Sequence, residues 1–523
     1  MIMNTPDEII NQTSKYISEY WEELIKPAIN VHKDLPISNS YISPSIKFNA
    51  LFYWDTYFQN LGLVIDDKYN LAQKCVENFI DEINEWGFIP NFNGPGWLSR
   101  TRSQPAFFCA MIHDLYAVSE DINLLKTFID PLESEYNYWT NPPKKYKFGL
   151  SRYYDTSFWS KLQPYSSIAE SGWDITNRFR YVKKSLPVDL NCLLYLYERD
   201  IPRFLEIIDE LDKSNNEKKW NQARDNRKNL INKYMWDEKR EFFYDYSVKS
   251  NRVERSSSLA GFYPMWVKII TQERAEKSAK KALEFLKPGG FVSTLDKKVG
   301  GFLRILKFMG LQWCYPIGWA PLQWIVNKGL CNYNFDYLAA ESALKWLSMV
   351  SRVYEKKNLI YEKYDVVNES IEDIQAHYKM HTGFGWTNAV FQALLTRIIF
   401  GIEPKFPNSI EFCPRIPLSW TGNSFSISLN NFPKIGLNIK INIESIDKDE
   451  NKMVIDLETN KSISMELKFL RRIDNEFKSI LINGEENIDE FKIIKFENSI
   501  ENKFIAYSKN TIPFKKGKNT ISI

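Results

Sequence analysis

Glu170-Ser171-Gly172-Trp173-Asp174 interrupts a chain whose N-terminal part otherwise has a largely helical pattern. Gly172 disfavours a helix by about 1 kcal/mol relative to alanine, and the sequence from Asp174 onward favours a loop or a helix cap. Trp173 gives Asp174 a partly apolar neighbour, and such desolvation raises the pKa of a carboxyl group. A general acid that protonates a glycosidic oxygen needs this property. Asp174 is therefore either such an acid or a cap of the following helix.

Helical periodicity dominates residues 1–405, which we expect to form one domain. Apolar side chains recur there at i, i+3 and i+4 spacing, and short loops with Gly, Pro, Asn or Ser separate the segments. About a dozen helices in hairpin pairs predict a helical toroid as readily as a bundle. The clearest segments are Leu71–Glu85, Gln104–Val118, Leu124–Trp139, Val188–Tyr197, Ile201–Leu211, Trp220–Trp236, Gln272–Leu286, Gln323–Asn327 and Tyr337–Val353.

Aromatic-rich segments recur between these helices, and we expect them to be loops. Loops of this kind, repeated once per helix pair, would gather at one end of a toroid and line a pocket. The segments are Phe52–Phe58, Trp86–Phe108, Leu150–Trp173, Phe242–Tyr246, Gln312–Trp319, Tyr361–Asp365 and Gly383–Trp386.

Residues 406–523 have a different pattern, in which apolar and polar residues alternate with period two. Asn483-Gly484 and Lys516-Gly517 mark turns. This pattern predicts an antiparallel β domain, a sandwich, packed against the helical domain. The predicted strands are Ser424–Leu429, Leu437–Ile443, Met453–Leu457, Ser462–Phe469, Ser479–Ile482, Phe491–Phe496 and Thr520–Ile523.

Composition and charge argue against several classes of binding partner. A net charge of +3 without a basic cluster argues against nucleic acid and anionic lipid as partners. The segment Met1–Glu8 is polar and acidic, unlike a signal peptide, and no apolar run reaches the roughly 18 residues that span a bilayer. We therefore expect a cytoplasmic protein without a membrane segment. The sequence does not indicate the oligomeric state.

Metal and nucleophile chemistry have little support. The six cysteines lack C-x-x-C spacing, which is typical of free buried thiols. His377 and His381 lack a third ligand nearby in the sequence, so we expect no metal site. Cys314 lies in an aromatic segment without a histidine partner in the sequence, and we interpret it as a buried thiol.

Carboxylates in aromatic surroundings are the strongest chemical signal. Asp55 lies in Tyr53-Trp54-Asp55-Thr56-Tyr57-Phe58, and Glu362 and Asp365 flank Lys363-Tyr364. Inverting glycoside hydrolysis needs one protonated carboxyl and one carboxylate that activates water, about 6.5–9.5 Å apart. Each of these acids can instead be a cap or one half of an ion pair, and for Glu362 the adjacent lysine favours that alternative.

Seven segments together resemble the trehalase family of inverting glycoside hydrolases, over most of residues 44–400 and in the family's order. This resemblance implies an (α/α)6 toroid, an exo-acting α-glycosidase, a small saccharide substrate and no cofactor. The segments are Phe48–Phe58 (FNALFYWDTYF), Gly87–Phe108 (GFIPNFNGPGWLSRTRSQPAFF), Glu170–Asp174 (ESGWD), Val188–Asn191 (VDLN), Gln312–Gln323 (QWCYPIGWAPLQ), Glu362–Asp365 (EKYD) and Gly383–Asn388 (GFGWTN).

The resemblance also implies residue roles. Asp174 corresponds to the general acid and Glu362 to the general base. Arg100 matches a family arginine, and a two-residue insertion makes Arg102 a second match. The implied substrate-binding residues are Phe48, Trp54, Asp55, Asn91, Arg100, Arg102, Gln104, Arg152, Gly172, Trp173, Trp313 and Trp386.

Departures from the family pattern concentrate where trehalases bind the second glucose. Lys47 and Asn49 stand in place of family arginines, Cys314 in place of an aspartate, and His377 in place of a glutamate. Lysine does not replace a bidentate arginine. We expect an α-glucosidase acting on trehalose or a related α-glucosyl compound, including one whose leaving group is not glucose. The alternatives are a catalytically inactive carbohydrate-binding homologue and a phosphorylase.

Overall fold

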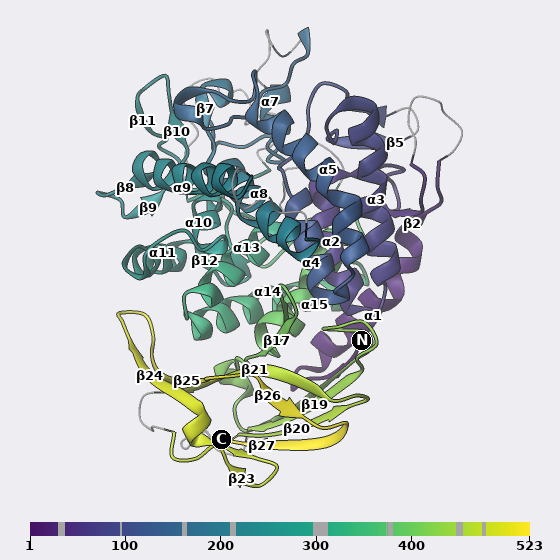
Figure 1. Ribbon diagram of the computed structural model, residues 1–523, viewed down its shortest axis with the longest axis vertical. Coiled ribbons are helices and arrows are strands. Elements are labelled where there is room, and N and C mark those ends of the chain that lie inside the picture. Colours follow the sequence, from purple (N-terminus) through teal and green to yellow (C-terminus); the bar gives the residue numbers. More distant parts are fainter. Residues whose placement is uncertain are drawn as a thin grey trace.

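The computed structural model describes residues 1–29, 37–94, 97–158, 160, 165–209, 216–295, 312–372, 374, 380–445, 453–472 and 477–523. Helices form the larger body of the molecule in Figure 1, and strands from the C-terminal part of the chain form a second body at one end of it. The two bodies meet where the helices α14 (Asp336–Lys357) and α15 (Gly385–Ala393) approach the sheets.

The helical body consists of an inner and an outer set of helices. Every residue of α2 and of α15 is buried, whereas α3 and α11 bury one face. Inner helices pack on outer neighbours along the chain, as α8 does on α9 and α13 on α14. The helices are α1 (Glu8–Leu24), α2 (Tyr53–Ile65), α3 (Tyr69–Trp86), α4 (Phe108–Ser119), α5 (Ile122–Thr140), α7 (Tyr165–Ala169), α8 (Val188–Ile207), α9 (Asn216–Tyr234), α10 (Tyr263–Trp266), α11 (Gln272–Phe285), α13 (Ala320–Asn332), α14 and α15.

The closure of the ring depends on a close approach between α2 and α15. A Cβ atom on Gly62 of α2 would lie 2.5 Å from the Cα of Ala389 in α15, so the two backbones touch at this glycine. Two inner helices from opposite ends of the helical part of the chain, α2 and α15, are therefore direct neighbours, and the helices form a closed toroid. Within the helical body, this contact brings the segments around Trp54 and Trp386 together.

Two expected loops are helices. Phe52–Phe58 falls largely in α2, and the end of Gly383–Trp386 falls in α15. Both helices are buried on all sides, so they lack the amphipathic periodicity by which outer helices are recognised. The segments predicted at Val188–Tyr197 and Ile201–Leu211 form the single helix α8, which continues through Pro202 to Ile207.

The C-terminal strands form two sheets. One sheet has the order β1-β18-β19-β20-β27-β22-β23, in which the N-terminal strand β1 (Ile2–Asn4) pairs antiparallel with β18. The other has the order β16-β17-β21-β25-β24, with β26 on β21, and its β17–β21 pairing is parallel. The strands are β16 (Ile402–Lys405), β17 (Ser409–Phe412), β18 (Ser424–Leu429), β19 (Ile439–Ser445), β20 (Met453–Thr459), β21 (Ile463–Arg472), β22 (Leu481–Ile482), β23 (Glu485–Glu486), β24 (Phe491–Glu497), β25 (Asn502–Ser508), β26 (Ile512–Phe514) and β27 (Gly517–Ser522).

A buried ion network joins the helices to the sheets. Asp336, at the start of α14, accepts hydrogen bonds from Arg415 Nε at 2.7 Å and from the Nζ atoms of Lys468 and Lys503 at 2.9 and 3.0 Å. All four side chains are almost fully buried. The three cations hold the pKa of Asp336 far below its usual value despite its burial.

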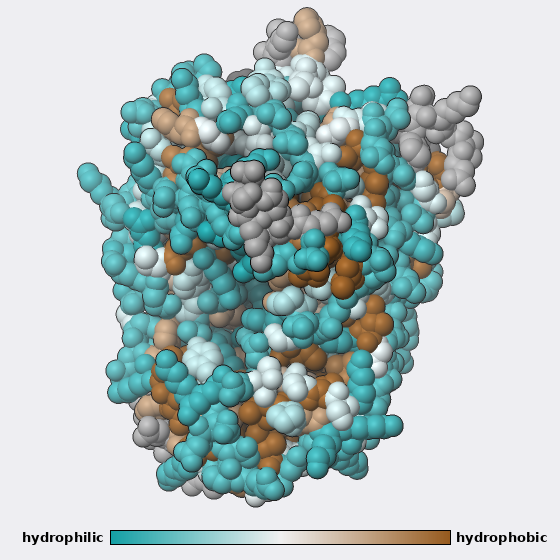
Figure 2. Space-filling model, in the orientation of Figure 1, coloured by the Kyte–Doolittle hydropathy of each residue, from teal (hydrophilic) through white to brown (hydrophobic). Residues whose placement is uncertain are grey.

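The exposed residues are mostly hydrophilic, and the cysteines are buried. Hydrophilic residues cover most of the face seen in Figure 2, and hydrophobic residues form scattered areas between them. Within the described ranges, no helix is long and apolar enough to cross a membrane. The six cysteines are free and buried, as the sequence predicts.

Candidate active site

Three carboxyl groups from distant parts of the chain meet near the inner end of the helical ring. Asp55 lies in the first turn of α2, Asp174 in the loop after α7, and Glu362 directly before the strand β15 (Lys363–Asp365). Asp174 and Glu362 both raise the pKa of Asp55, and Glu362 also raises that of Asp174, so the three groups lie within electrostatic reach of one another. The toroid thus brings together acids that are far apart in the sequence.

The Asp174 loop is shaped by a glycine that packs on a tryptophan. Gly172 has φ of +72°, and a Cβ atom there would lie 2.6 Å from Cζ2 of Trp54. Only glycine meets both conditions without strain, because it tolerates positive φ and has no side chain to clash. The loop therefore lies flat against the indole of Trp54, which places Asp174 beside the first turn of α2.

The far side of this loop is anchored by a buried arginine. Arg178 donates two hydrogen bonds to Asp189 at 2.6 and 2.7 Å and two to Asp245 at 2.7 Å, and its guanidinium lies 4.8 Å from the ring of Trp173. Bidentate pairs of this kind fix geometry as well as charge. The VDLN segment that contains Asp189 thus supports the loop rather than the substrate.

Glu170, at the start of the same loop, also has a structural role. Its carboxylate accepts hydrogen bonds from the backbone N–H of Ser103 at 2.9 Å and of Tyr154 at 2.5 Å, and it pairs with the buried Lys144. One carboxylate thereby ties together three chain segments around Asp174.

The environment of Asp174 is that of a carboxyl able to hold a proton near neutral pH. Burial raises its pKa to about 6, the carboxylate of Glu362 adds to the increase, and Arg102 and Lys363 oppose it. Of the two matching arginines, Arg102 is the one whose charge acts on Asp174, and its Nη1 lies 3.5 Å from Asp155 Oδ2. Arg100 is exposed.

Glu362 has a different environment, dominated by its neighbour. The Nζ atom of Lys363 lies 2.5 Å from Glu362 Oε1 and donates a second hydrogen bond, of 2.9 Å, to Gln312 Oε1. Burial lowers the pKa of Lys363, and Glu362 opposes that decrease. The indole N–H of Trp386 donates to the backbone oxygen of Glu362 at 3.1 Å, which fixes the strand end. Glu362 is thus a buried carboxylate with a cationic partner.

Asp55 has an electrostatic environment that differs from those of Asp174 and Glu362. Burial raises its pKa well above the usual range, and Asp174 and Glu362 add to the increase. The surroundings of Asp55 therefore favour its protonated form. A protonated carboxyl both donates and accepts hydrogen bonds, which suits a group that holds sugar hydroxyls.

Indole rings surround the three acids. Trp313 stacks on Trp319 with ring centres 3.9 Å apart and on Trp173 at 5.4 Å. Trp54 lies 5.5 Å from Trp313 and 5.9 Å from Trp386, the latter edge to face. The hydroxyl of Thr176 donates to the backbone oxygen of Trp313 at 3.0 Å and so links the Asp174 loop to the indole cluster.

The remaining predicted residues differ in what they contact. Gln104 Oε1 accepts from the backbone N–H of Trp54 at 3.0 Å, and Asn91 donates to the backbone oxygens of Ser103 and Ala169, each at 3.3 Å. Both side chains are buried and hold the α2 end of the site.

Arg152 and Phe48 make contacts with residues other than the three acids. Arg152 donates to the backbone oxygens of Pro143 and Lys183 and packs 3.8 Å from the ring centre of Tyr146. No hydrogen bond or ion pair found among the described residues joins it to Asp174 or Glu362. Phe48 packs against His381, with ring centres 4.5 Å apart.

The lysine next to Glu362 suggested an ion pair, and the structure contains that pair. The position of His381 next to Phe48 was not predicted from the sequence. Burial, with Lys47 and Lys363, lowers the pKa of His381 to about 4, so the imidazole is neutral at neutral pH. Burial raises the pKa of the Cys314 thiol to about 12, as expected of an inert thiol. His377 lies outside the described residues.

Comparison with known proteins identifies close similarities. A family model described as Trehalase matches residues 2–164 and 164–399. The periplasmic trehalase of Salmonella paratyphi B is 31% identical over 433 residues, covering 73% of this chain and 73% of that protein. The neutral trehalase of Saccharomyces cerevisiae superimposes with a TM-score of 0.59 and 27% identity, over 73% of this chain and 79% of that one.

A more distant structure supports the fold alone. The GH63 mannosylglycerate hydrolase of Thermus thermophilus, in complex with glucose, has a TM-score of 0.57 and 16% identity, over 74% of this chain and 100% of that one. Together with the trehalase structure, it confirms the (α/α)6 toroid predicted from the sequence.

One expectation is wrong. The sequence analysis predicted a cytoplasmic protein from the polarity of its first residues, but the similar Salmonella proteins are periplasmic trehalases. N-terminal polarity is a weaker argument than a likeness that extends over most of the chain.

Proposed function

The chain belongs to the trehalase family and is a glycoside hydrolase, and we propose that it cleaves a small α-glucoside by single displacement with inversion. The observation that carries the proposal is the meeting of Asp55, Asp174 and Glu362 among indole rings, in three different electrostatic environments. Pairs of carboxyl groups whose surroundings differ in this way are typical of acid and base partners.

In the proposed mechanism, Asp174 protonates the glycosidic oxygen as the bond to the leaving group breaks. Its pKa of about 6 leaves a useful protonated fraction near neutral pH. Glu362 accepts a proton from the attacking water, and the ammonium of Lys363 keeps the carboxylate paired while the acid is protonated. Asp55 binds sugar hydroxyls, and Trp54 and Trp313 form part of the wall around the sugar ring.

Trehalose is the first substrate to test, and the leaving-group side is where we expect specificity to differ. The side chain of Asn49, which replaces a family arginine, accepts a hydrogen bond from Tyr41 at 3.2 Å. Lys47 is close enough to His381 to lower its pKa, and His381 packs on Phe48. Lys47 and Asn49 replace two bidentate arginines with an ammonium and an amide, which favours a related α-glucoside as the second candidate substrate.

The test is glucose release from trehalose and a panel of other α-glucosides in phosphate-free buffer. The Asp174→Asn and Glu362→Gln proteins are expected to fold normally and to lose at least about a thousandfold in kcat, as expected when an essential proton donor or acceptor is removed. Glu372→Gln is the matched control, because the side chain of this exposed glutamate pairs only with Lys357 on the surface among the described residues. Full turnover in either site variant would remove that residue from its role.

A further inference from the structure

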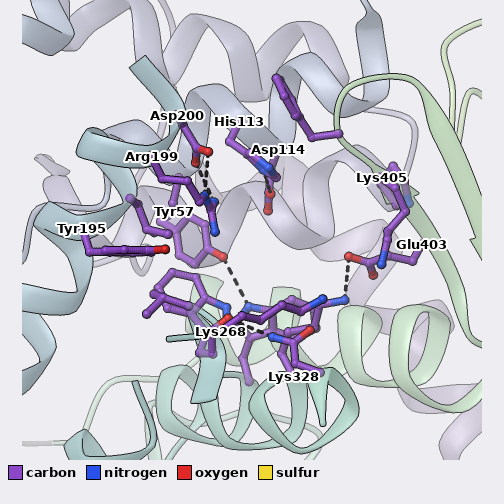
Figure 3. A pocket seen from close by; sticks show the side chains of 18 of the residues that line it. Tyr57, His113, Asp114, Tyr195, Arg199, Asp200, Lys268, Lys328, Glu403 and Lys405 are labelled. Atoms are coloured by element: carbon purple, nitrogen blue, oxygen red, sulfur yellow. Dashed lines mark hydrogen bonds and ion pairs between the residues drawn. The ribbon is translucent and has the colours of Figure 1, made fainter. Parts of the chain in front are cut away.

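A cavity lies in the helical body, lined on one side by Tyr57 of α2, the helix that also carries Asp55. It has a volume of about 370 Å³, within the range of small-molecule sites, and contains none of the predicted catalytic or substrate-binding residues. Side chains from α2, α4, α8, α13 and β16 line it, together with the segment that follows α10. Figure 3 shows labelled side chains from these separate elements surrounding one space.

Cations outnumber carboxylates around this cavity. Its lining contains three carboxylates, Asp114, Asp200 and Glu403, and Glu411 pairs with Lys405 from outside. Counting Glu411, the cations exceed the carboxylates by two. The cationic side chains are Arg199, Arg203, Lys268, Lys328, Arg397 and Lys405.

All but one of these cations have a carboxylate partner. Arg199 Nη2 lies 2.6 Å from Asp200, Lys328 Nζ 2.8 Å from Glu403, and Lys405 Nζ 3.0 Å from Glu411. Arg203 shares Asp200 at 3.2 Å, and Arg397 shares Glu403 at 2.7 Å. Lys268 carries one of the two excess charges, and the other arises because Arg199 and Arg203 share the single carboxylate of Asp200.

Lys268 has no hydrogen bond or ion pair from its ammonium to any residue that the structure describes. Its backbone adopts φ of +61°, a conformation that lysine rarely takes and that tertiary contacts must hold. Lys268 is solvent-exposed at the cavity, and desolvation by its surroundings, with Lys405, Lys328 and Arg199 close by, lowers its pKa to about 8 against the opposing charge of Glu411. The lysine is therefore held in a positive potential that a bound anion would relieve.

The rest of the lining is aromatic. Tyr57, Tyr195, Trp266, Trp324 and Phe406 supply flat apolar walls beside the charged groups. The indole N–H of Trp324 donates to the hydroxyl of Tyr57 at 3.4 Å, and the ring of Tyr57 stacks on Phe107 at 4.6 Å. A charged end and an aromatic wall suit a ligand that has both an anionic group and a ring.

We propose that this cavity binds a small multivalent oxyanion of the phosphate class, either inorganic phosphate or the phosphate group of a sugar phosphate. The ammonium of Lys268 is the central contact, and Arg199, Lys328 and Lys405 surround it. Two excess positive charges match a dianion, and a phosphate accepts several hydrogen bonds at once. The inference does not depend on the identity of the glucoside that the active site cleaves.

Isothermal titration calorimetry on the full chain tests this inference directly. Inorganic phosphate and glucose 6-phosphate are titrated in separate arms, with glucose as the uncharged control. We expect saturable phosphate binding by the wild type and at least about tenfold weaker binding by Lys268→Met, which removes one charge-assisted contact. Lys228→Met, on the exposed face of α9, removes the same charge away from the cavity and should bind like the wild type.

The two arms also separate the ligand sources. Tighter binding of glucose 6-phosphate than of phosphate supports a sugar phosphate held by the aromatic walls, and equal affinities support the inorganic anion. Lys268→Gln is a second variant without the charge, and a thermal melt without phosphate checks that each variant is folded. The inference is overturned if no saturable binding occurs at millimolar phosphate. It is also overturned if folded Lys268→Met binds phosphate as tightly as the wild type, a result that would place the anion elsewhere, for example near Lys363.

Discussion

The packing of Gly172 on Trp54 yields the sharpest prediction, because the chain provides its own control. Gly172 and Gly87 both have φ of +72°, so alanine is equally disfavoured by the backbone at each. At Gly172 an added Cβ atom would lie 2.6 Å from Trp54, whereas nothing lies within 4 Å of one at Gly87. The difference between Gly172→Ala and Gly87→Ala therefore isolates the contact with the tryptophan.

The expected losses of stability follow from the backbone conformation and from the contact with Trp54. Left-handed backbone costs alanine about 1–2 kcal/mol at either position. Overpacking against Trp54 adds about 1–3 kcal/mol, so Gly172→Ala should lose about 2–5 kcal/mol of unfolding free energy. If the loop shifts to relieve the clash, Asp174 shifts with it, and a misplacement of about 1 Å costs on the order of a hundredfold in turnover.

Urea denaturation gives the unfolding free energies, and initial rates on the best α-glucoside give kcat. We expect Gly87→Ala to keep its kcat and Gly172→Ala to lose most of it. If the two variants lose the same stability and both keep their turnover, the contact with Trp54 does not position the acid, and the reasoning is refuted.

Three further predictions concern charge. With the pKa of Asp174 at about 6, the proton donor is lost as pH rises, and kcat/KM should fall toward tenfold per pH unit above about pH 6; a rate that stays constant to pH 8 would exclude Asp174 as the acid. Arg102→Met should move this fall to higher pH, since Arg102 lowers the pKa of Asp174, whereas the exposed Arg100→Met should not; pH profiles of kcat/KM decide between them. Asp336→Asn should cost about 3 kcal/mol or more, because it removes the carboxylate that three buried cations share, and the surface control Asp225→Asn should cost under about 0.5 kcal/mol, both measured in urea titrations. Because the folded-state pKa of Asp336 is depressed, its stabilisation is complete above its ordinary pKa near 4 and is lost as the pH falls toward the folded value, which melts at acid pH measure.

Local patterns in the sequence predicted much of the fold. The outer helix α3 was recognisable because it buries one face only, and Asn483-Gly484, whose φ values are +54° and +83°, forms the predicted turn between β22 and β23. The inner helix α2 was not recognisable, because it is buried on every side and carries no period. Burial on all sides is a property of the ring, which no window of sequence contains.

The candidate site likewise combines features that the sequence indicated with features that only the folded chain brings together. An acid beside Trp173 and a glycine before it suggested a desolvated carboxyl, and the structure gives Asp174 a raised pKa. Which arginine acts on that acid depends on how the loop folds, and sequence alone left Arg100 and Arg102 equivalent. The anchoring of the loop by Arg178 joins residues from three segments and was beyond any local pattern.

The anomeric form of the first glucose released is the most direct test of the proposed mechanism. Proton NMR during the first minutes of trehalose hydrolysis reports it before mutarotation mixes the anomers. Inversion by Asp174 and Glu362 predicts equal amounts of β-glucose, from the attacked ring, and α-glucose, from the leaving one. With an α-glucoside whose leaving group is not glucose, the first glucose should be entirely β. Release of α-glucose alone would show retention and contradict the assignment of Glu362 as a base acting on water.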